Sequence, residues 1–236
     1  AGAAGIGCAV MLTKTFGLDP SRVLLLERGE TVGESFRRWP KEMRFISPSF
    51  NQQGWTNSFD LNSVAHGTSI AYSLHSEHPS GSEYADYLEA LVGASRLRVR
   101  TQTDVLSVEA EGAKDGPAGF GVRVHSMESG KEKLTARFVV WAAGEFQYPR
   151  KGSGALPGAE LCMHNSSVRS WASLPGDNFV LIGGYESGAD AAVNLAKAGK
   201  QCTVLASTAT WNVQTADPST ELAPYTAQRL RDVTAA

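Results

Sequence analysis

The pattern of apolar and polar positions along the first part of the chain predicts helices and a short strand, separated by a long irregular segment. Residues 5–16, GIGCAVMLTKTF, place apolar side chains at helical spacing, and residues 21–29, SRVLLLERG, form the short apolar run that is typical of a strand. Residues 31–80 contain few periodic runs and many of Ser, Gly, Pro and Asn, so we expect loops and short helices there. Residues 80–95 open with a capping box and predict a further helix.

The second part of the chain shows strand periodicity, followed by a unit of strand, helix and strand. Residues 97–111, 119–127 and 132–144 alternate well enough to predict three strands, in a small antiparallel meander from about Leu97 to Ala142. Residues 180–207, VLIGGYESGADAAVNLAKAGKQCTVLAS, indicate a strand, a glycine turn, a helix and a second strand. Because another glycine turn opens the chain, we predict an α/β fold of two Rossmann-like dinucleotide-binding modules. Each module has three layers and a mostly parallel sheet.

The opening residues, AGAAGIGCAV, contain the end of a dinucleotide-binding glycine motif. In G-x-G-x-x-G the glycines allow a tight turn, close approach to a pyrophosphate and close helix packing, while the helix N-terminus faces the phosphates. Gly2 and Gly5 match the last two glycines, so the first falls before Ala1, and we expect the chain to be part of a longer protein. Glu27 follows Gly5 by 22 residues, where a carboxylate accepts hydrogen bonds from a ribose. The alternative is a flexible chain end with Glu27 as a solvated strand terminus.

The second glycine turn departs from the motif in its middle position. Gly183 and Gly188 fill the first and third glycine positions, but Tyr185 stands where the backbone normally approaches the pyrophosphate. Glu186, Ser187 and the helix N-terminus are the remaining groups that could bind a phosphate or a ribose. The alternative is that this turn only packs a helix onto a sheet.

The strand after the second turn, residues 201–207, ends on Ser207 and not on an acid. It therefore has no carboxylate to select a free 2′-hydroxyl and none to repel a 2′-phosphate. This favours NADPH over NADH at the second turn.

Composition and charge narrow the class of protein. Of the 236 residues, 42% are hydrophobic and 19% are charged, which is typical of a soluble globular protein. The net charge is −2 without a cluster of Lys and Arg, which argues against nucleic acid or a membrane surface as a partner. No apolar run is long enough to span a bilayer. Cys8, Cys162 and Cys202 match neither C-x-x-C nor a metal spacing, so we expect no metal site and a cytoplasmic location.

Four segments together resemble the flavin-containing monooxygenases and the thioredoxin-reductase-like pyridine nucleotide-disulfide oxidoreductases. They are GAAGIGCA, VLLLERGETVGESFRRWP, VVWAAGEFQYP and IGGYESGADAA. The resemblance implies FAD at the first turn and NADP at the second. It also implies an FAD-binding domain over residues 1–148 that lacks its first strand, a connector over residues 149–178, and an incomplete NAD(P)H-binding domain over residues 179–236.

The resemblance further implies which residues contact the cofactors. Glu27 is expected on the FAD ribose, the loop from Gly33 to Trp39 beside the pyrophosphate and flavin, and the backbone of Val105 against the adenine. The implied FAD-binding residues are Gly2, Ala4, Gly5, Glu27, Arg28, Ser35, Trp39, Val105, Ala143 and Gly144. The implied NADP-binding residues are Gly183, Gly184, Glu186, Ser187 and Gly188. The resemblance assigns no catalytic residue.

The function that the resemblance implies is that of a flavin-dependent NAD(P)H oxidoreductase. Hydride passes from NAD(P)H to FAD, and electrons then pass to oxygen or to a small organic substrate, as in a monooxygenase. Two departures leave alternatives open. The chain has no C-x-x-C and has Ala4 where a bacillithiol-disulfide-reductase-like group has cysteine, and His164 lies in an incomplete monooxygenase fingerprint. The alternatives are a flavin-dependent disulfide reductase without C-x-x-C and a non-catalytic FAD/NAD(P)-binding module or sensor. The sequence also leaves open whether the chain forms a homo-oligomer.

Overall fold

The chain forms two compact units, each described here by itself. The computed structural model describes residues 1–49, 60–112, 119–145, 148–150, 154–212, 217 and 220–234. The first unit contains Ala1–Arg37, Ser63–Thr68 and Glu83–Tyr148, and the second contains Arg38–Asn62, Ser69–Ser82 and Pro149–Ala236. Two segments of the irregular region predicted over residues 31–80 therefore belong to the second unit.

The first unit contains a two-stranded parallel sheet that follows the first helix. Helix α1 (Ala3–Val10) continues into a π-helical turn, Met11–Thr15, and a short 3₁₀ turn, Pro20–Arg22, leads to β1 (Leu24–Leu26). Strand β1 pairs in parallel with β2 (Arg98–Arg100). Helix α2 (Glu34–Arg37) and, from Glu83 on, helix α4 (Gly81–Ala94) also belong to this unit. The apolar residues of α1 that share one face are buried, as the helical spacing predicts: Ile6, Ala9 and Val10.

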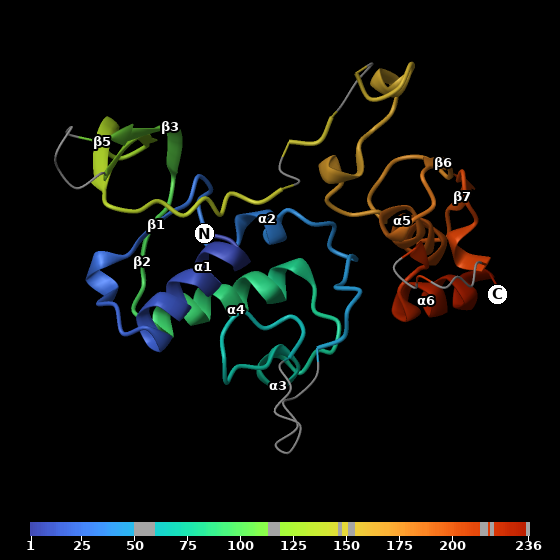
Figure 1. Ribbon diagram of the computed structural model, residues 1–236. Helices are drawn as coiled ribbons and strands as arrows, with labels where there is room; N and C mark the ends of the chain where they lie inside the picture. The colour runs from blue at the N-terminus through green and yellow to red at the C-terminus, as the bar shows by residue number, and fades with distance from the viewer. Residues whose placement is uncertain are drawn as a thin grey trace. The chain divides into compact units, whose positions relative to one another are not determined.

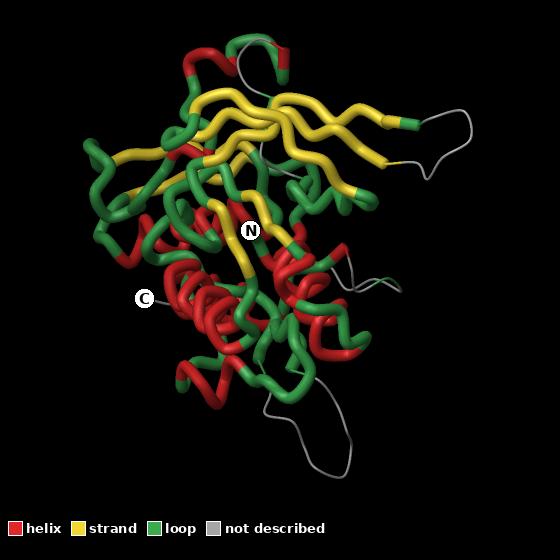
Figure 2. The backbone as a smooth tube through the Cα atoms, turned by 90° about the vertical axis from the view of Figure 1, so that its left-hand side faces the viewer, coloured by secondary structure: helices red, strands yellow, loops and turns green. Residues whose placement is uncertain are grey.

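The first unit also contains a three-stranded antiparallel sheet in the order β3-β4-β5. Its strands are β3 (Thr103–Glu111), β4 (Gly119–Ser126) and β5 (Gly130–Ala136), which form the long twisted yellow ribbons of Figure 2. The prediction of one strand over residues 97–111 was wrong. Gln102 adopts a left-handed backbone conformation, with φ of 49°, which ends β2 and turns the chain into β3.

The third predicted strand, residues 132–144, is also shorter than expected. Strand β5 ends at Ala136, and residues 137–144 have no strand pairing with any part of the chain that the structure describes. A strand needs a hydrogen-bonded neighbour, so apolar alternation alone does not make one. The meander therefore spans Thr103–Ala136 and not Leu97–Ala142.

The second unit contains a parallel pair of strands with a helix between them in sequence. Strands β6 (Asn178–Ile182) and β7 (Gln201–Leu205) are connected by α5 (Glu186–Lys197), and α6 (Pro224–Thr234), which the sequence reading missed, lies alongside α5 (Figure 1). This unit also includes α3 (Ile70–Leu74) and short 3₁₀ turns at Ala159–Leu161, Asn165–Ser167 and Thr210–Asn212. Its core packs α5 against the segment before β6 through Val168, Trp171, Ala191 and Leu195.

The parallel pairs β1–β2 and β6–β7 and the antiparallel sheet β3–β4–β5 confirm the predicted α/β fold class. The domain boundaries near residues 148 and 178 stay a prediction. Among the described residues, none of the helices combines the length and the apolar character that crossing a membrane requires.

Candidate functional site: two glycine turns

The first glycine turn and Glu27 lie next to each other. The first bond of α1 runs from the Ile6 N–H to the Gly2 carbonyl, over 3.0 Å, so the helix begins directly after Gly2 and includes Ala4 and Gly5. Glu27 follows β1, and its carboxylate forms an ion pair with the terminal amino group of Ala1, with 2.5 Å between Oε2 and the nitrogen. Its Oε1 accepts a hydrogen bond of 2.7 Å from the Gly29 N–H. The carboxylate that was predicted for a ribose is therefore held at the start of α1.

Other predicted FAD-binding residues of the first unit lie close to this turn. The Thr103 N–H donates to the Glu27 carbonyl over 2.9 Å, so β3, which contains Val105, begins beside Glu27. A β-carbon on Gly5 would stand 3.6 Å from the side chain of Ala142, so the segment that leads to Ala143 and Gly144 passes beside α1. The structure thus brings together segments that are more than a hundred residues apart in the printed sequence.

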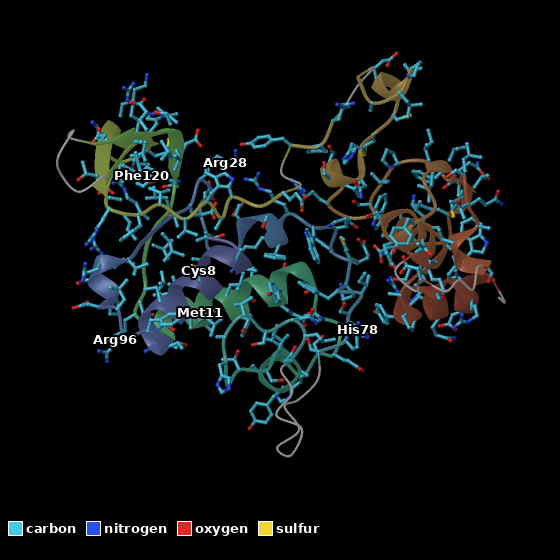
Figure 3. All side chains as sticks on the ribbon, in the orientation of Figure 1. Cys8, Met11, Arg28, His78, Arg96 and Phe120 are labelled. Carbon is cyan, nitrogen blue, oxygen red and sulfur yellow. The ribbon has the colours of Figure 1, made fainter. Side chains whose placement is uncertain are left out.

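Arg28 is placed at the carboxyl end of β1 (Figure 3). Its guanidinium donates a hydrogen bond to the hydroxyl of Tyr148 and lies 5.4 Å from the centre of that ring. Such an arrangement combines a hydrogen bond with a cation–π contact. Tyr148 was not among the residues singled out in the sequence, because no local motif connects it with Arg28.

The loop predicted to run beside the flavin is divided between the two units. Ser35 lies in α2, and the preceding Gly33 donates its N–H to the Ala1 carbonyl over 3.0 Å, so this part of the loop is beside the first turn. Trp39 belongs to the second unit, where its ring packs against Phe45 with a centroid distance of 5.0 Å. The role of Trp39 at the flavin stays a prediction.

The second glycine turn is closely packed. Gly183 has a φ of 106°, and its N–H donates to the Leu205 carbonyl over 2.9 Å, which joins the turn to β7. A β-carbon on Gly188 would overlap the carbonyl oxygen of Gly183 and stand 2.9 Å from its carbonyl carbon. Only glycine fits at position 188, which is the close helix–strand contact expected of the third glycine of the motif. Tyr185 precedes the helix in an extended conformation with 47% of its surface exposed.

The segment after β7 folds onto Gly184. The Thr210 hydroxyl donates to the Gly184 carbonyl over 2.5 Å, and a β-carbon on Gly184 would stand 2.8 Å from the Trp211 ring. Position 184 therefore has no room for a side chain. No local pattern in the sequence indicates this contact of Trp211 with the turn.

Glu186 makes contacts that the sequence reading did not foresee. Its Oε1 accepts a hydrogen bond of 2.5 Å from the Ala223 N–H, and its Oε2 accepts one of 2.6 Å from the Thr226 hydroxyl. Both carboxylate oxygens are therefore engaged by the beginning of α6. Ser187 follows in the first turn of α5. Whether a nucleotide contacts either residue is not decided by these contacts, so both roles stay predictions.

One helical turn further along α5 lies a buried ion pair. Arg229 Nη1 donates to Asp190 Oδ1 over 2.6 Å, and Arg229 Nη2 donates to Asn194 Oδ1 over 3.0 Å. Burial raises the pKa of the Asp190 carboxyl, and the hydrogen bond from Arg229 opposes this rise. A periodic reading of α6 would have placed Arg229 on its inner face, but that helix was not predicted.

His164, which lies in the incomplete monooxygenase fingerprint, is exposed on the surface. Its Nδ1 accepts a hydrogen bond of 3.2 Å from the Ser166 N–H and so caps a short 3₁₀ turn. This contact favours the structural interpretation of His164. Cys8, Cys162 and Cys202 form no disulfide, and no cluster of metal-ligating side chains occurs among the described residues.

The profile of the pyridine nucleotide-disulphide oxidoreductase family matches residues 1–236. The chain belongs to this family. It is 26% identical over 200 residues to CzcO, an uncharacterized oxidoreductase of Bacillus velezensis, and the match covers 84% of this chain and 50% of that protein. The chain therefore spans about half the length of the curated relative.

Two solved structures show the same fold. The flavin-containing monooxygenase of Stenotrophomonas maltophilia matches with a TM-score of 0.67 and 19% identity, over 99% of this chain and 64% of that one. The bacillithiol disulfide reductase Bdr (YpdA) of Bacillus cereus matches with a TM-score of 0.62 and 22% identity, over 99% of this chain and 62% of that one. At these identities the likeness shows the fold alone. The family match over residues 1–236 confirms the predicted superfamily.

The residues at the first turn fit the adenosine part of FAD. A β-carbon on Gly2 would meet no atom within 4 Å, so the turn has open space, and Glu27 supplies an acceptor beside it. The second turn fits a dinucleotide less completely. The N-terminus of α5 is present, but Tyr185 replaces the middle glycine and Trp211 packs on Gly184.

Proposed function

We propose that this chain forms the nucleotide-binding part of a flavin-dependent NAD(P)H oxidoreductase of the monooxygenase type. The observation that supports this most strongly is the position of Glu27, whose carboxylate lies beside the glycine turn that begins α1. A carboxylate at this place accepts hydrogen bonds from an adenosine ribose. Membership of the pyridine nucleotide-disulphide oxidoreductase family supports the same assignment.

In this proposal the residues of the first unit hold FAD and those of the second unit hold NADPH. Glu27 binds the ribose, and the α1 N-terminus faces the pyrophosphate. Arg28 follows Glu27 in the sequence and donates a hydrogen bond to the Tyr148 hydroxyl. FAD, when bound, supplies the redox chemistry of the reaction with NADPH and a small-molecule substrate. The wide spacing of the three cysteines supports a cytoplasmic location.

A non-catalytic nucleotide-binding module is the second candidate. Two features of the second turn favour it: the side chain of Tyr185 and the contact of Trp211 with Gly184. A disulfide reductase is a third candidate, and for this reaction the protein would need a redox-active thiol. Cys202 is half-buried, and burial raises the pKa of its thiol, which is opposite to the lowered pKa of a reactive cysteine.

The test is spectroscopic. The purified chain is loaded with FAD and dialysed, and its flavin absorbance is followed under anaerobic conditions while NADPH is added. Retained flavin that is bleached by NADPH and recovers in air supports the oxidoreductase. Retained flavin that NADPH does not bleach supports the module, and failure to retain flavin contradicts the assignment of the first turn. Bacillithiol disulfide, offered in place of air, tests the reductase.

A further inference from the structure

Three polar side chains on one face of α5 point to α6. Glu186, Asp190 and Asn194 are spaced by four residues and therefore lie one above another along the helix. Their partners on the α6 side are the Ala223 N–H, the Thr226 hydroxyl and the Arg229 guanidinium. The contact between the two helices is therefore largely polar.

The first of these contacts lies at the beginning of both helices. The Glu186 carboxylate accepts from the N–H of the residue that precedes α6 and from Thr226, whose side chain is fully buried. Backbone N–H groups at a helix N-terminus carry partial positive charge and have no partner within the helix. The N-terminus of α6 therefore compensates the negative charge of Glu186.

The remaining contacts fix α6 along its length. Arg229 bonds to Asp190 and Asn194, and its guanidinium lies 5.1 Å from the centre of the Tyr225 ring. His78 stacks on the Tyr225 ring with a centroid distance of 3.7 Å and an interplanar angle of 9°. Because these groups are ordered by several partners, α6 has a defined position against α5.

The charge of Glu186 matters because of where it stands. It is the first residue of α5, and the N-terminus of α5 is the group that would face a pyrophosphate. A carboxylate in that turn repels an anionic ligand unless the charge is compensated nearby. Compensation by α6 would therefore leave the N–H groups of α5 to act on the ligand.

We propose that Glu186 is a positioning residue, which holds α6 against α5 and is neutralised by it, and that docking of α6 thereby favours a dinucleotide at the second glycine turn. This inference rests on the proposed function, because it concerns the same NADPH site. It assigns to α6 a role in cofactor affinity although none of the α6 residues needs to touch the cofactor.

The experiment is a double-mutant cycle on the FAD-loaded chain. Thr226→Val keeps the shape of the side chain and removes the hydroxyl donor, Glu186→Gln removes the charge and keeps an acceptor, and the third variant combines both. Thr234→Val is the matched control, because Thr234 is exposed at the far end of α6 and bonds only to carbonyls of its own helix among the described contacts. Each protein is titrated with NADPH, and its thermal unfolding is recorded.

We expect Thr226→Val to weaken NADPH binding about fivefold or more, since it leaves the Glu186 charge less compensated. In the Glu186→Gln background the same substitution should leave the affinity unchanged, because there is no charge to compensate. Thr234→Val should match the parent. Thr226→Val should also lower Tm by about 2–4 °C, and the loss in the double variant should be smaller than the sum of the single losses.

The proposal is overturned if Thr226→Val binds NADPH as the parent does, or if its defect persists at full size in the Glu186→Gln background. Either result leaves the proposed function intact, because the parent still binds NADPH. If the parent itself does not bind NADPH, the proposed function fails at the second turn. In that case the thermal-unfolding data of the double-mutant cycle assign Glu186 to the contact between α5 and α6 alone. The proposed effect of Glu186 on cofactor binding is then overturned as well.

Discussion

The two glycine turns of this chain differ in where their acidic residue stands and in what it contacts. At the first turn the acid is Glu27, at the end of the strand after the helix, with its carboxylate beside the start of α1. At the second turn the corresponding strand end has no acid, and Glu186 stands in the first turn of the helix. Both Glu186 oxygens accept hydrogen bonds from the beginning of α6, whereas the Glu27 oxygens are bonded by Ala1 and Gly29.

The glycines of the two turns therefore differ in how much they leave space for a ligand and how much they pack a helix against a strand. The first turn has open space at Gly2 and ordinary contact distances at Gly5. The second turn is filled by its own backbone at Gly188 and by Trp211 at Gly184. A motif match alone indicates a helix that begins close to a strand, whereas ligand binding depends on the space and the acceptors that surround it.

The largest effect is expected from Gly188→Ala. The added β-carbon would overlap the carbonyl oxygen of Gly183, and because the obstacle is backbone, α5 must move away from β6. We expect a loss of about 4 kcal/mol in the free energy of unfolding, measured by chemical denaturation. At the first turn Gly5→Ala should cost far less, since its β-carbon would meet Ala142 at 3.6 Å.

Gly93→Ala, in α4, is the control for a glycine in a helix. No atom lies within 4 Å of its β-carbon position, so this substitution should be neutral or slightly stabilising. Equal losses in the Gly188→Ala and Gly5→Ala proteins would show that the two turns are packed alike, contrary to the comparison drawn above.

The next effect concerns the buried pair of the second unit. Arg229→Leu leaves the Asp190 carboxylate without its cation, and we expect a loss of about 3–4 kcal/mol near neutral pH. Adding Asp190→Asn to this variant should restore part of the stability, because the uncompensated charge is removed.

The loss in Arg229→Leu should also depend on pH in a defined direction. Burial already raises the pKa of Asp190, and without Arg229 nothing of that pair opposes the rise. A carboxyl whose folded pKa lies above its unfolded value stabilises the fold below the unfolded pKa and loses this contribution as the pH rises through the folded pKa. Relative to the parent, the variant should therefore recover toward pH of about 4. A loss of stability in Arg229→Leu, relative to the parent, that grows as the pH falls would contradict this prediction.

Glu27→Gln should affect cofactor binding more than stability. The substitution keeps the shape of the side chain and removes charge-assisted hydrogen bonds to the FAD ribose, each contributing about 1.5–3 kcal/mol. We expect FAD affinity to fall by tens of fold or more, measured by fluorescence titration of the apoprotein. Glu186→Gln is the matched variant at the second turn and should leave FAD affinity unchanged. Unchanged FAD affinity in Glu27→Gln would show that the first turn is wrongly assigned.

The parts of this fold that could be predicted are those in which local pattern and tertiary contact agree. The helix over Gly81–Ala94 and the units around both glycine turns are examples, since apolar spacing, turn residues and capping all indicate the same element. The split of residues 97–111 into two strands was not predictable from alternation. It depends on the left-handed Gln102 and on pairing of β2 with β1, which lies more than seventy residues earlier.

In the candidate site too, local spacing predicts some contacts, and others depend on residues that are distant in the sequence. The closeness of Glu27 to the first turn could be inferred from spacing, because the motif is built within one strand–helix–strand unit. The contacts of Glu186 could not, because their partners are in a helix more than thirty residues away that was not recognised. The contact of Trp211 with Gly184 could not be inferred either, since nothing local indicates that the chain after β7 returns to Gly184.

The smallest effect is expected from Tyr185→Gly, which tests whether the second turn differs from the first only in its middle residue. Tyr185 is extended and about half exposed, and it precedes α5 without capping the helix through its side chain. If NADPH binds with the tyrosine directed away from the pyrophosphate, glycine should leave the affinity equal or raise it by up to about threefold, because the backbone permits closer approach. The free turn should lose about 0.5–1 kcal/mol of stability, since glycine gives up more conformational freedom on folding.

The comparison that decides the matter is a titration with NADPH of the parent, Tyr185→Gly and Gly188→Ala under one set of conditions. A true site gives binding in the parent, equal or tighter binding in Tyr185→Gly, and none in Gly188→Ala, whose turn is displaced. Weaker binding in Tyr185→Gly would mean that the tyrosine ring itself contacts the nucleotide, which makes the departure from the motif a feature of recognition. Three titrations without binding would leave the second turn as a packing element, with FAD at the first turn as the only nucleotide of the proposal. This outcome would favour the non-catalytic module, because no NADPH would then be held near the flavin.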